Sequence, residues 1–137
     1  FAAKDSDIQS RQLLLIDIDR IGDKTNPATE EEISKAMELA ENLLTALALE
    51  GWPKPLQMLS GNGVHLYYRL DEIENTKRTR DLIKITLIGL ARRFDTPEVG
   101  IDKAVYNASR ITKVPGTIMR KGEASANRPY RMARVLS

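Results

Sequence analysis

The sequence has no cysteine and only one histidine among its 137 residues. Without cysteine there are no disulfides, no cysteine nucleophile and no thiolate zinc sites, and a single histidine argues against metal sites built from several imidazoles. No apolar run approaches the roughly 18 to 20 residues of a membrane span, and the N-terminus has no signal-peptide layout. We therefore expect a cytoplasmic protein with no membrane partner, in which any metal is held mainly by oxygen.

Internal repeats, low-complexity tracts and long linkers are also missing, and a composition of 42% hydrophobic and 29% charged residues is typical of one domain with its own core. The net charge of +2 is unevenly distributed. From Lys103 onward there are eight basic residues and one acid, Glu123, which gives +7 and leaves −5 for residues 1–102. This asymmetry indicates a polyanionic partner such as nucleic acid or a triphosphate. A solvated basic surface would give the same counts.

Apolar periodicity predicts strands and helices in alternation. A strand over residues 13–19 is followed by a loop, and Gly61-Asn62-Gly63 joins two strands in a hairpin between residues 56 and 70. A short strand ends at Asp102, and residues 109–122 and 128–136 read as further strands around a Pro-Gly turn. With the two helices described next, this order predicts an α+β fold in which two helices pack on one face of a mainly antiparallel sheet.

Two helices have clear boundaries in the sequence. Thr29 and Glu32 form a capping box that begins the first helix, which continues to about Glu50. Asn75 or Thr76 caps the second helix, which ends near residue 94. The apolar residues expected on the buried faces are Ile33, Met37, Ala40, Leu44 and Leu47 in the first helix, and Leu82, Ile85 and residues 88–90 in the second.

The first strand ends in two carboxylates, in the stretch Leu-Leu-Leu-Ile-Asp-Ile-Asp. Side chains alternate along a strand, so Asp17 and Asp19 share one face, together with Leu13. Two such acids repel each other unless a cation lies between them, and Mg²⁺ or Mn²⁺ takes carboxylate oxygens. Asp102, which also ends a strand, is a candidate third ligand. The alternative is that Asp17 and Asp19 are surface acids at a strand end, one of them paired with Arg20.

The Ser60–His65 turn is a candidate phosphate site. Gly61 and Gly63 on either side of Asn62 let backbone N–H groups approach an anion. His65 follows at the start of a strand and can donate to a phosphate oxygen, and the Ser60 hydroxyl can add a second donor. A lone histidine is also compatible with a purely structural role.

Arg110 and Lys113 could neutralise a triphosphate beside a carboxylate-bound metal. On a strand these two residues would face opposite sides, because they lie three positions apart. Basic surface or internal salt bridges remain the alternative for both.

Taken in order, these motifs resemble the catalytic core of the archaeo-eukaryotic primase superfamily, and most closely the primase-polymerases of plasmids, phages and mobile elements. The resemblance covers roughly residues 5 to 134, and it implies a catalytic core with a fold similar to an RNA-recognition motif, in agreement with the α+β order read above. The matching segments are Asp17-Ile18-Asp19, Ser60-Gly61-Asn62-Gly63-Val64-His65, Asp102, Asn107, Ser109-Arg110-Ile111, Pro115-Gly116-Thr117, Lys121-Gly122 and Arg128-Pro129.

The resemblance implies a role for each matching residue. Asp17, Asp19 and Asp102 match three carboxylates that hold two divalent ions, Mg²⁺ or Mn²⁺, for nucleotidyl transfer. Ser60 and His65, with Gly61, Asn62 and Gly63 of the same turn, match the motif that contacts the nucleotide phosphates. Arg110 matches a basic position expected to contact the triphosphate, and we assign similar roles to Lys113 and Lys121.

The implied activity is that of a DNA-directed primase-polymerase, with nucleoside triphosphates and a DNA template and primer as partners. Members of the superfamily usually carry an N-terminal subdomain before the first acidic motif, and we expect residues 1–137 to be a single catalytic domain that lacks it. A separate subdomain or a helicase is a further candidate partner. Two alternatives remain open: a non-catalytic nucleotide- or nucleic-acid-binding module with the same fold, and a metal-dependent nuclease or replication-initiation protein.

Overall fold

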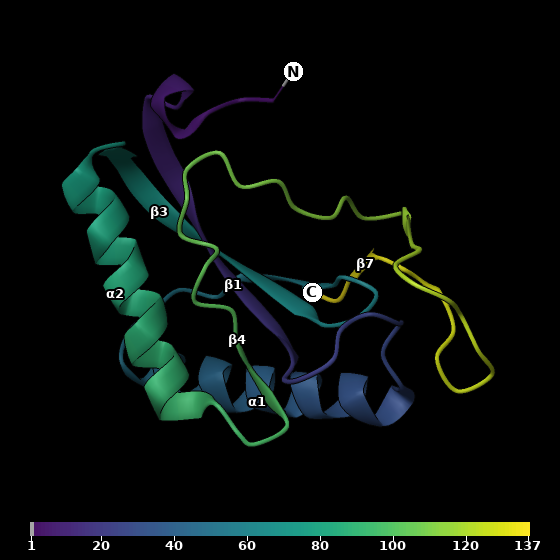
Figure 1. Cartoon of the computed structure of the whole chain (residues 1–137). Helices are drawn as coiled ribbons and strands as arrows, with labels where there is room; N and C mark the ends of the chain where they lie inside the picture. Colours follow the sequence, from purple (N-terminus) through teal and green to yellow (C-terminus); the bar gives the residue numbers. More distant parts are fainter. Residues whose placement is uncertain (1) are drawn as a thin grey trace.

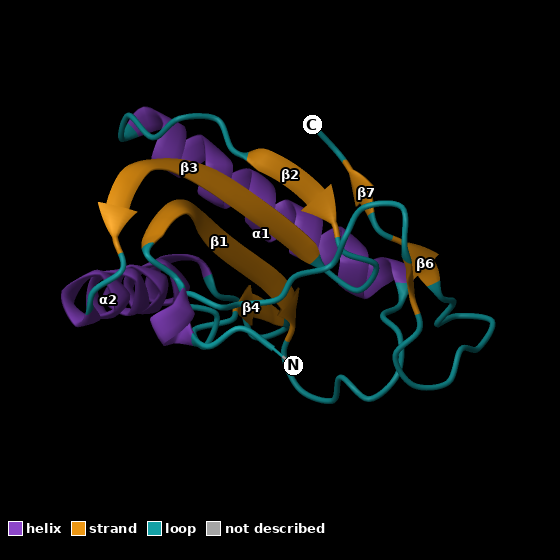
Figure 2. Cartoon of the chain, turned by 90° about the horizontal axis from the view of Figure 1, so that it is seen from above, coloured by secondary structure: helices purple, strands orange, loops and turns teal. Residues whose placement is uncertain are grey.

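The computed structural model describes residues 2–137 and contains a five-stranded antiparallel sheet with the order β4-β1-β3-β2-β7, which is seen from two sides in Figures 1 and 2. Its strands are β1 (Ser10–Arg20), β2 (Leu56–Leu59), β3 (Val64–Glu74), β4 (Val99–Ile101) and β7 (Arg134–Val135). Two α-helices connect the strands: α1 (Glu30–Leu49) lies between β1 and β2, and α2 (Lys77–Phe94) lies between β3 and β4. The predicted α+β fold is confirmed. The units β1-α1-β2 and β3-α2-β4 each form a split βαβ motif, and their strands alternate in the sheet.

Local capping explains where the helices begin and end. Thr29 Oγ1 accepts the Glu32 N–H at 3.1 Å, and the Glu32 carboxylate accepts the Thr29 N–H at 2.8 Å, so the predicted capping box is confirmed. Gly51 follows α1 with a φ of +90°, a conformation that glycine adopts without strain. Thr76 caps α2, whereas the Asn75 side chain instead donates to two carbonyls of the N-terminal segment. No helix within residues 2–137 is long and apolar enough to cross a membrane.

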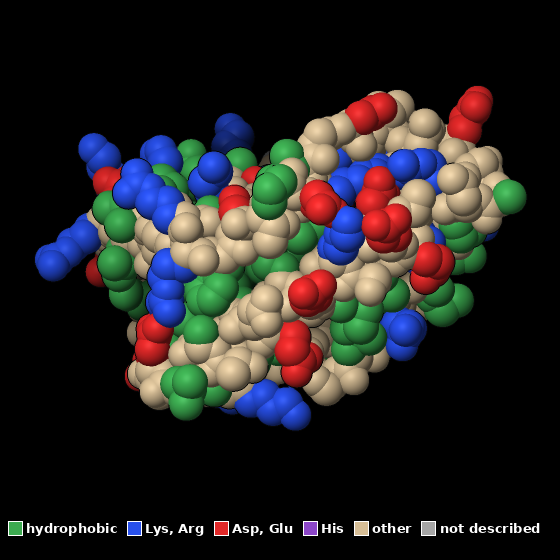
Figure 3. Space-filling view, turned by 90° about the horizontal axis from the view of Figure 1, so that it is seen from below, with side chains coloured by type: hydrophobic (Ala, Val, Ile, Leu, Met, Phe, Trp, Pro, Cys, Tyr) green, Lys and Arg blue, Asp and Glu red, His purple; other side chains and the backbone are tan. Residues whose placement is uncertain are grey.

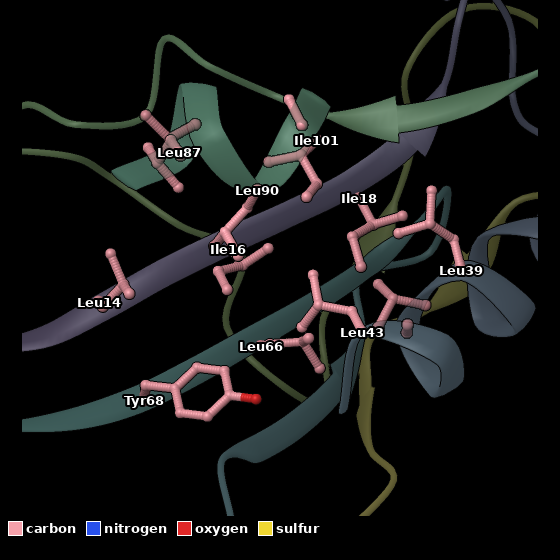
Figure 4. Close-up of a cluster of buried hydrophobic side chains, with 14 of the residues drawn as sticks. Leu14, Ile16, Ile18, Leu39, Leu43, Leu66, Tyr68, Leu87, Leu90 and Ile101 are labelled. Atoms are coloured by element: carbon pink, nitrogen blue, oxygen red, sulfur yellow. The ribbon is translucent and has the colours of Figure 1, made fainter. Parts of the chain in front are cut away.

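Alternation along β1 divides the sheet into a helix-covered face and an open face. Leu14, Ile16 and Ile18 point toward the helices and are fully or almost fully buried (Figure 4). They pack with the following residues of β3, α1, α2 and β4: Leu66, Tyr68, Leu39, Leu43, Leu87, Leu90 and Ile101. Because both helices cover this face, the intervening residues of β1 lie on the other side of the sheet.

Part of the expected helix packing is wrong. Met37 in α1 is 42% exposed, and Leu82 and Ile85 in α2 are 56% and 65% exposed. The buried face of α2 instead centres on Ile83 and Leu87. Apolar residues occupy more than half of the circumference of α2, so periodicity alone does not determine which side of the helix is buried. That side is determined by contact with the sheet.

The basic C-terminal region forms less strand than expected. Residues 107–117 contain no strand, and only β5 (Ile118–Met119) and β6 (Arg131–Met132) pair in a small second sheet. Pro115 has no N–H to donate to a ladder and Gly116 has a φ of +88°, so the chain turns there. After β4 the chain therefore passes as a loop on the side away from α1 to reach β5 and β6 (Figures 1 and 2).

Candidate active site

The pairing of β1 with β3 places the first carboxylate beside the histidine. Asp17 lies opposite His65 in the register, and the distance between Asp17 Oδ1 and His65 Nε2 is 3.4 Å. Directly opposite residues share a face, so both side chains lie on the open side of the sheet. His65 is buried, and Tyr67 Oη lies 3.3 Å from its Nδ1. Each ring nitrogen therefore has one neighbouring oxygen that orients the imidazole.

Asp19 is the second carboxylate on this face. Its Oδ1 accepts the N–H of Arg20 at 2.7 Å, and Lys24 Nζ lies 3.9 Å from Oδ2. Burial raises the pKa of Asp19 above its ordinary value; the Arg20 N–H and Lys24 oppose this shift, and the charge of Asp17 adds to it. The guanidinium of Arg20 binds Glu32 instead, so it does not pair with either carboxylate as the surface-acid alternative supposed.

Asp102 lies on the other side of Asp17. The register pairs Ile18 with Ile101, and the Asp102 N–H donates to the Asp17 carbonyl at 2.9 Å, so Asp102 lies opposite Asp17 one position beyond β4. Its Oδ1 accepts the N–H of Ala104 at 2.8 Å, and its Oδ2 lies 4.0 Å from Nη2 of Arg110. Asp102 is therefore next to Asp17 in the sheet, but its carboxylate contacts the segment that follows β4.

A cavity of about 250 Å³ on the open face collects most of the residues that the sequence singled out. The predicted site residues in its lining are Asp17, Asp19, Ser60, Asn62, His65, Arg110, Lys113 and Lys121. Leu15, Ile111, Thr112 and Met119 complete the lining. Leu15 and Ile111 belong to stretches that the sequence analysis quotes, but none of the four had been assigned a role in the site. Asp102, Gly61 and Gly63 do not line this cavity. We call this cavity the carboxylate pocket.

The Ser60–Gly63 turn has a clear structural role. Ser60 Oγ accepts the Gly63 N–H and donates to the Gly63 carbonyl, each at 3.1 Å. A Cβ on Gly63 would lie 2.2 Å from the carbonyl oxygen of Ile18, and Gly61 has a φ of +108° with Met119 close by. The glycines therefore allow the turn to approach β1 and the C-terminal region, while contact with phosphate remains a prediction.

Two of the cations that line the carboxylate pocket, Arg110 and Lys113, come from the loop between β4 and β5, and the third, Lys121, follows β5. Arg110 and Lys113 lie on an irregular segment, so both reach the pocket, whereas on a strand they would have faced opposite sides. Lys113 Nζ donates to the Ile118 carbonyl at 3.0 Å. Asp5 anchors the segment from far along the chain, since its Oδ1 accepts from the N–H and the hydroxyl of Ser109 at 3.1 and 2.6 Å. Sequence reasoning missed Asp5, because no local pattern marks a contact across 104 positions.

Other basic residues near the C-terminus are neutralised within the molecule. Arg128 contacts both oxygens of Glu32 at 3.0 and 3.1 Å, and Arg20 binds the same carboxylate at 2.8 Å. Arg131 binds Glu30 at 2.8 Å. On the side where α1 lies, acidic and basic side chains are intermixed (Figure 3). Arg128 and Arg131 therefore form internal salt bridges, and fewer positive charges are available at the pocket than the residue count of this region suggests.

The carboxylates of the pocket are the candidate ligands of a divalent ion. Within residues 2–137 no group of three or more His, Asp or Glu side chains is arranged to hold a metal. Asp17 and Asp19 nevertheless suit Mg²⁺ or Mn²⁺, since such ions are usually held by one or two carboxylates, with water and substrate phosphate completing the shell. Asp102 would have to leave Arg110 and Ala104 to join them. The residues fit one ion at Asp17 and Asp19 better than a preformed two-ion site.

Comparison with known proteins gives one informative likeness. No protein-family profile matches the chain, and no curated protein matches it. The solved structure of the polymerase domain from Mycobacterium tuberculosis ligase D, in complex with DNA, superimposes with a TM-score of 0.53 at 20% sequence identity. The match covers 88% of this chain and 44% of that one, so residues 1–137 span less than half of the neighbour. This likeness shows that the two proteins share a fold.

Proposed function

We propose that this chain is a metal-dependent nucleotidyltransferase core of the primase-polymerase type, which uses nucleoside triphosphates and a DNA template and primer. The observation that carries the proposal is the carboxylate pocket itself. Asp17, Asp19 and His65 form its floor on the sheet, and Arg110, Lys113 and Lys121 enter from the loops that follow β4. The polymerase domain that shares the fold was solved with DNA, which supports a nucleic-acid substrate.

The acidic and the basic residues of the pocket have different roles in this proposal. A divalent ion bound at Asp17 and Asp19 would neutralise phosphate charge and lower the pKa of an attacking hydroxyl. Arg110 and Lys121 bind the remaining phosphate oxygens and orient the triphosphate beside the carboxylates. His65, held at Nδ1 by Tyr67, can donate a hydrogen bond from Nε2 to a phosphate oxygen in place of its contact with Asp17. The chain therefore acts mainly by placing charges in a fixed arrangement around the reacting groups.

Primer extension tests this proposal. The protein is incubated with a primed DNA template, deoxynucleotides and Mg²⁺ or Mn²⁺, and extension is followed on a gel. We expect the Asp17→Ala variant to lose activity by about 100-fold or more, a loss typical of removing a group that stabilises developing charge. Asp71→Ala is the matched control, because Asp71 is an exposed carboxylate of β3 outside the pocket. Equal extension by wild type and Asp17→Ala would refute the assignment.

A specific observation also favours a second function, a nucleotide-binding module without catalysis. Asp102 contacts Arg110 and Ala104, and no three-ligand cluster is preformed within residues 2–137. This alternative predicts nucleotide binding that weakens steeply with salt, because phosphate contacts release counterions, together with no extended primer under any metal. Cleavage of labelled DNA without added nucleotide would instead indicate a nuclease.

A further inference from the structure

A second and larger cavity lies along β1, next to the carboxylate pocket. Its volume is about 360 Å³, and it is bounded by Ile8 and residues 10–15 on one side and by the loop that follows β4 on the other. Leu13, Leu15 and Tyr67 give it an apolar wall, while Asn107 and Thr112 contribute an amide and a hydroxyl. We call this cavity the side cleft. Apolar and aromatic surface with a few polar groups is the usual composition of a site for an organic ligand.

The side cleft and the carboxylate pocket are continuous. Leu15, Arg110 and Thr112 line both of them. On the sheet, Leu15 pairs with Tyr67 in the row next to the pair of Asp17 and His65, so moving one row along β1 leads from charged to apolar surface. A ligand that extends across the two cavities would meet carboxylates and cations at one end and apolar and aromatic groups at the other.

From this continuity we propose that the side cleft binds the nucleobase and sugar of the nucleoside triphosphate whose phosphates occupy the carboxylate pocket. The inference rests on the proposed function. A nucleoside triphosphate has the required polarity, because its anionic chain is joined to a flat, largely uncharged base that carries hydrogen-bonding groups along its edge. The larger cavity suits the bulkier nucleoside, and Arg110, at the junction, contacts the phosphate nearest the sugar.

Tyr67 is the residue on which this assignment depends most. Its ring lines the side cleft, while its hydroxyl lies 3.3 Å from His65 Nδ1 and so reaches toward the carboxylate pocket. Any of the four bases that packs against this ring gains stacking energy, because every base has an aromatic face. Tyr67 would therefore link base binding to the position of the histidine.

The test compares ATP with inorganic tripolyphosphate, both with Mg²⁺, by isothermal titration calorimetry. ATP should bind wild type more tightly than tripolyphosphate does. The Tyr67→Leu variant should lose about tenfold in ATP affinity with little change for tripolyphosphate. Tyr130→Leu is the matched control, because Tyr130 lies outside both cavities. Thermal unfolding followed by circular dichroism checks that each variant folds.

Leu13→Trp tests the same inference independently of Tyr67, and can be used if Tyr67→Leu fails to fold. Leu13 is 56% exposed at the rim of the side cleft, so Leu13→Trp narrows the cleft without disturbing the core. It should weaken ATP binding and leave tripolyphosphate binding unchanged.

The outcomes separate this inference from the proposed function. If tripolyphosphate binds and ATP gains nothing over it, only the inference is refuted. The inference alone is also refuted if Tyr67→Leu weakens binding of a single-stranded oligothymidylate and leaves the affinity for ATP unchanged. In that case the side cleft would bind a nucleic-acid strand instead of a free nucleotide. If neither ATP nor tripolyphosphate binds wild type, the proposed function and the inference are refuted together.

Discussion

Replacing Glu32 with glutamine tests whether the acidic start of α1 holds the C-terminal region in place. The Glu32 carboxylate accepts hydrogen bonds from Arg20 and Arg128 and also from the N–H of Thr29. Arg128 belongs to the chain between β5 and β6, so this one carboxylate connects β1, α1 and the C-terminal region. Glu32→Gln keeps the size of the side chain and removes its charge.

The expected loss follows from the pKa of Glu32. Burial raises this pKa, but the hydrogen bonds from Arg128 and Arg20 outweigh that effect and lower it from 4.5 to about 2. At 1.36 kcal/mol per pKa unit the shift corresponds to about 3 kcal/mol, which solvent screening of this partly exposed group reduces to about 2 kcal/mol. Because the folded-state pKa is the lower one, this stabilisation is complete above pH 4.5 and disappears as the pH falls toward 2.

Urea unfolding in steps between about pH 7 and pH 3 measures this effect. At neutral pH the variant should be less stable than wild type by about 2 kcal/mol, and the difference should shrink below pH 4.5. Glu31→Gln is the control, since Glu31 lies in the same turn with its side chain 77% exposed and should change stability by less than about 0.5 kcal/mol. A difference that stays constant across the whole pH range would refute the reasoning.

Two further predictions concern packing around the site. Gly63→Ala should destabilise the protein by about 1 to 3 kcal/mol in urea unfolding, because its Cβ would lie 2.2 Å from the carbonyl oxygen of Ile18. Gly89→Ala in α2 meets nothing within 4 Å and should instead stabilise by about 0.5 to 1 kcal/mol, so equal effects at the two glycines would contradict this explanation. Asp5→Ala should release Ser109 and speed amide hydrogen exchange in residues 105–112 while α1 keeps its protection. Unchanged exchange in that segment would show that other contacts hold it.

The elements that the sequence predicts correctly depend on local chemistry. The boundaries of α1 follow from the Thr29 capping box and from Gly51, both of which act within a few residues of the helix ends. The rotation of α2 could not be predicted, because the choice between Leu82 and Ile83 as the buried residue depends on where the sheet lies. Residues 109–122 were expected to pair as strand, yet only Ile118–Met119 do so, because strand formation needs a partner edge and Pro115 interrupts the ladder.

In the candidate site, too, the features that depend on local sequence could be predicted and those that depend on distant contacts could not. Asp17 and Asp19 could be placed on one face from their spacing alone. The tight turn before His65 predicts that β3 pairs with β2, but not that β3 also pairs with β1 and so brings His65 beside Asp17. The direction of the Asp102 side chain could not be predicted, since it follows from the Arg110 loop. That loop is in turn positioned by Asp5, a residue with no recognisable motif.

The origin of the charges in the carboxylate pocket has a thermodynamic consequence. The acids belong to the sheet, and the cations belong to loops that enter later in the chain, with Arg110 lying 4.0 Å from Asp102. A metal ion alone must compete with these cations, and a polyphosphate alone must approach the carboxylates. A metal–polyphosphate complex satisfies both sets at once. We therefore expect positive coupling, in which each ligand raises the affinity for the other by the same factor. Such a site would discriminate between ligands by the pairing of charges as well as by their shape.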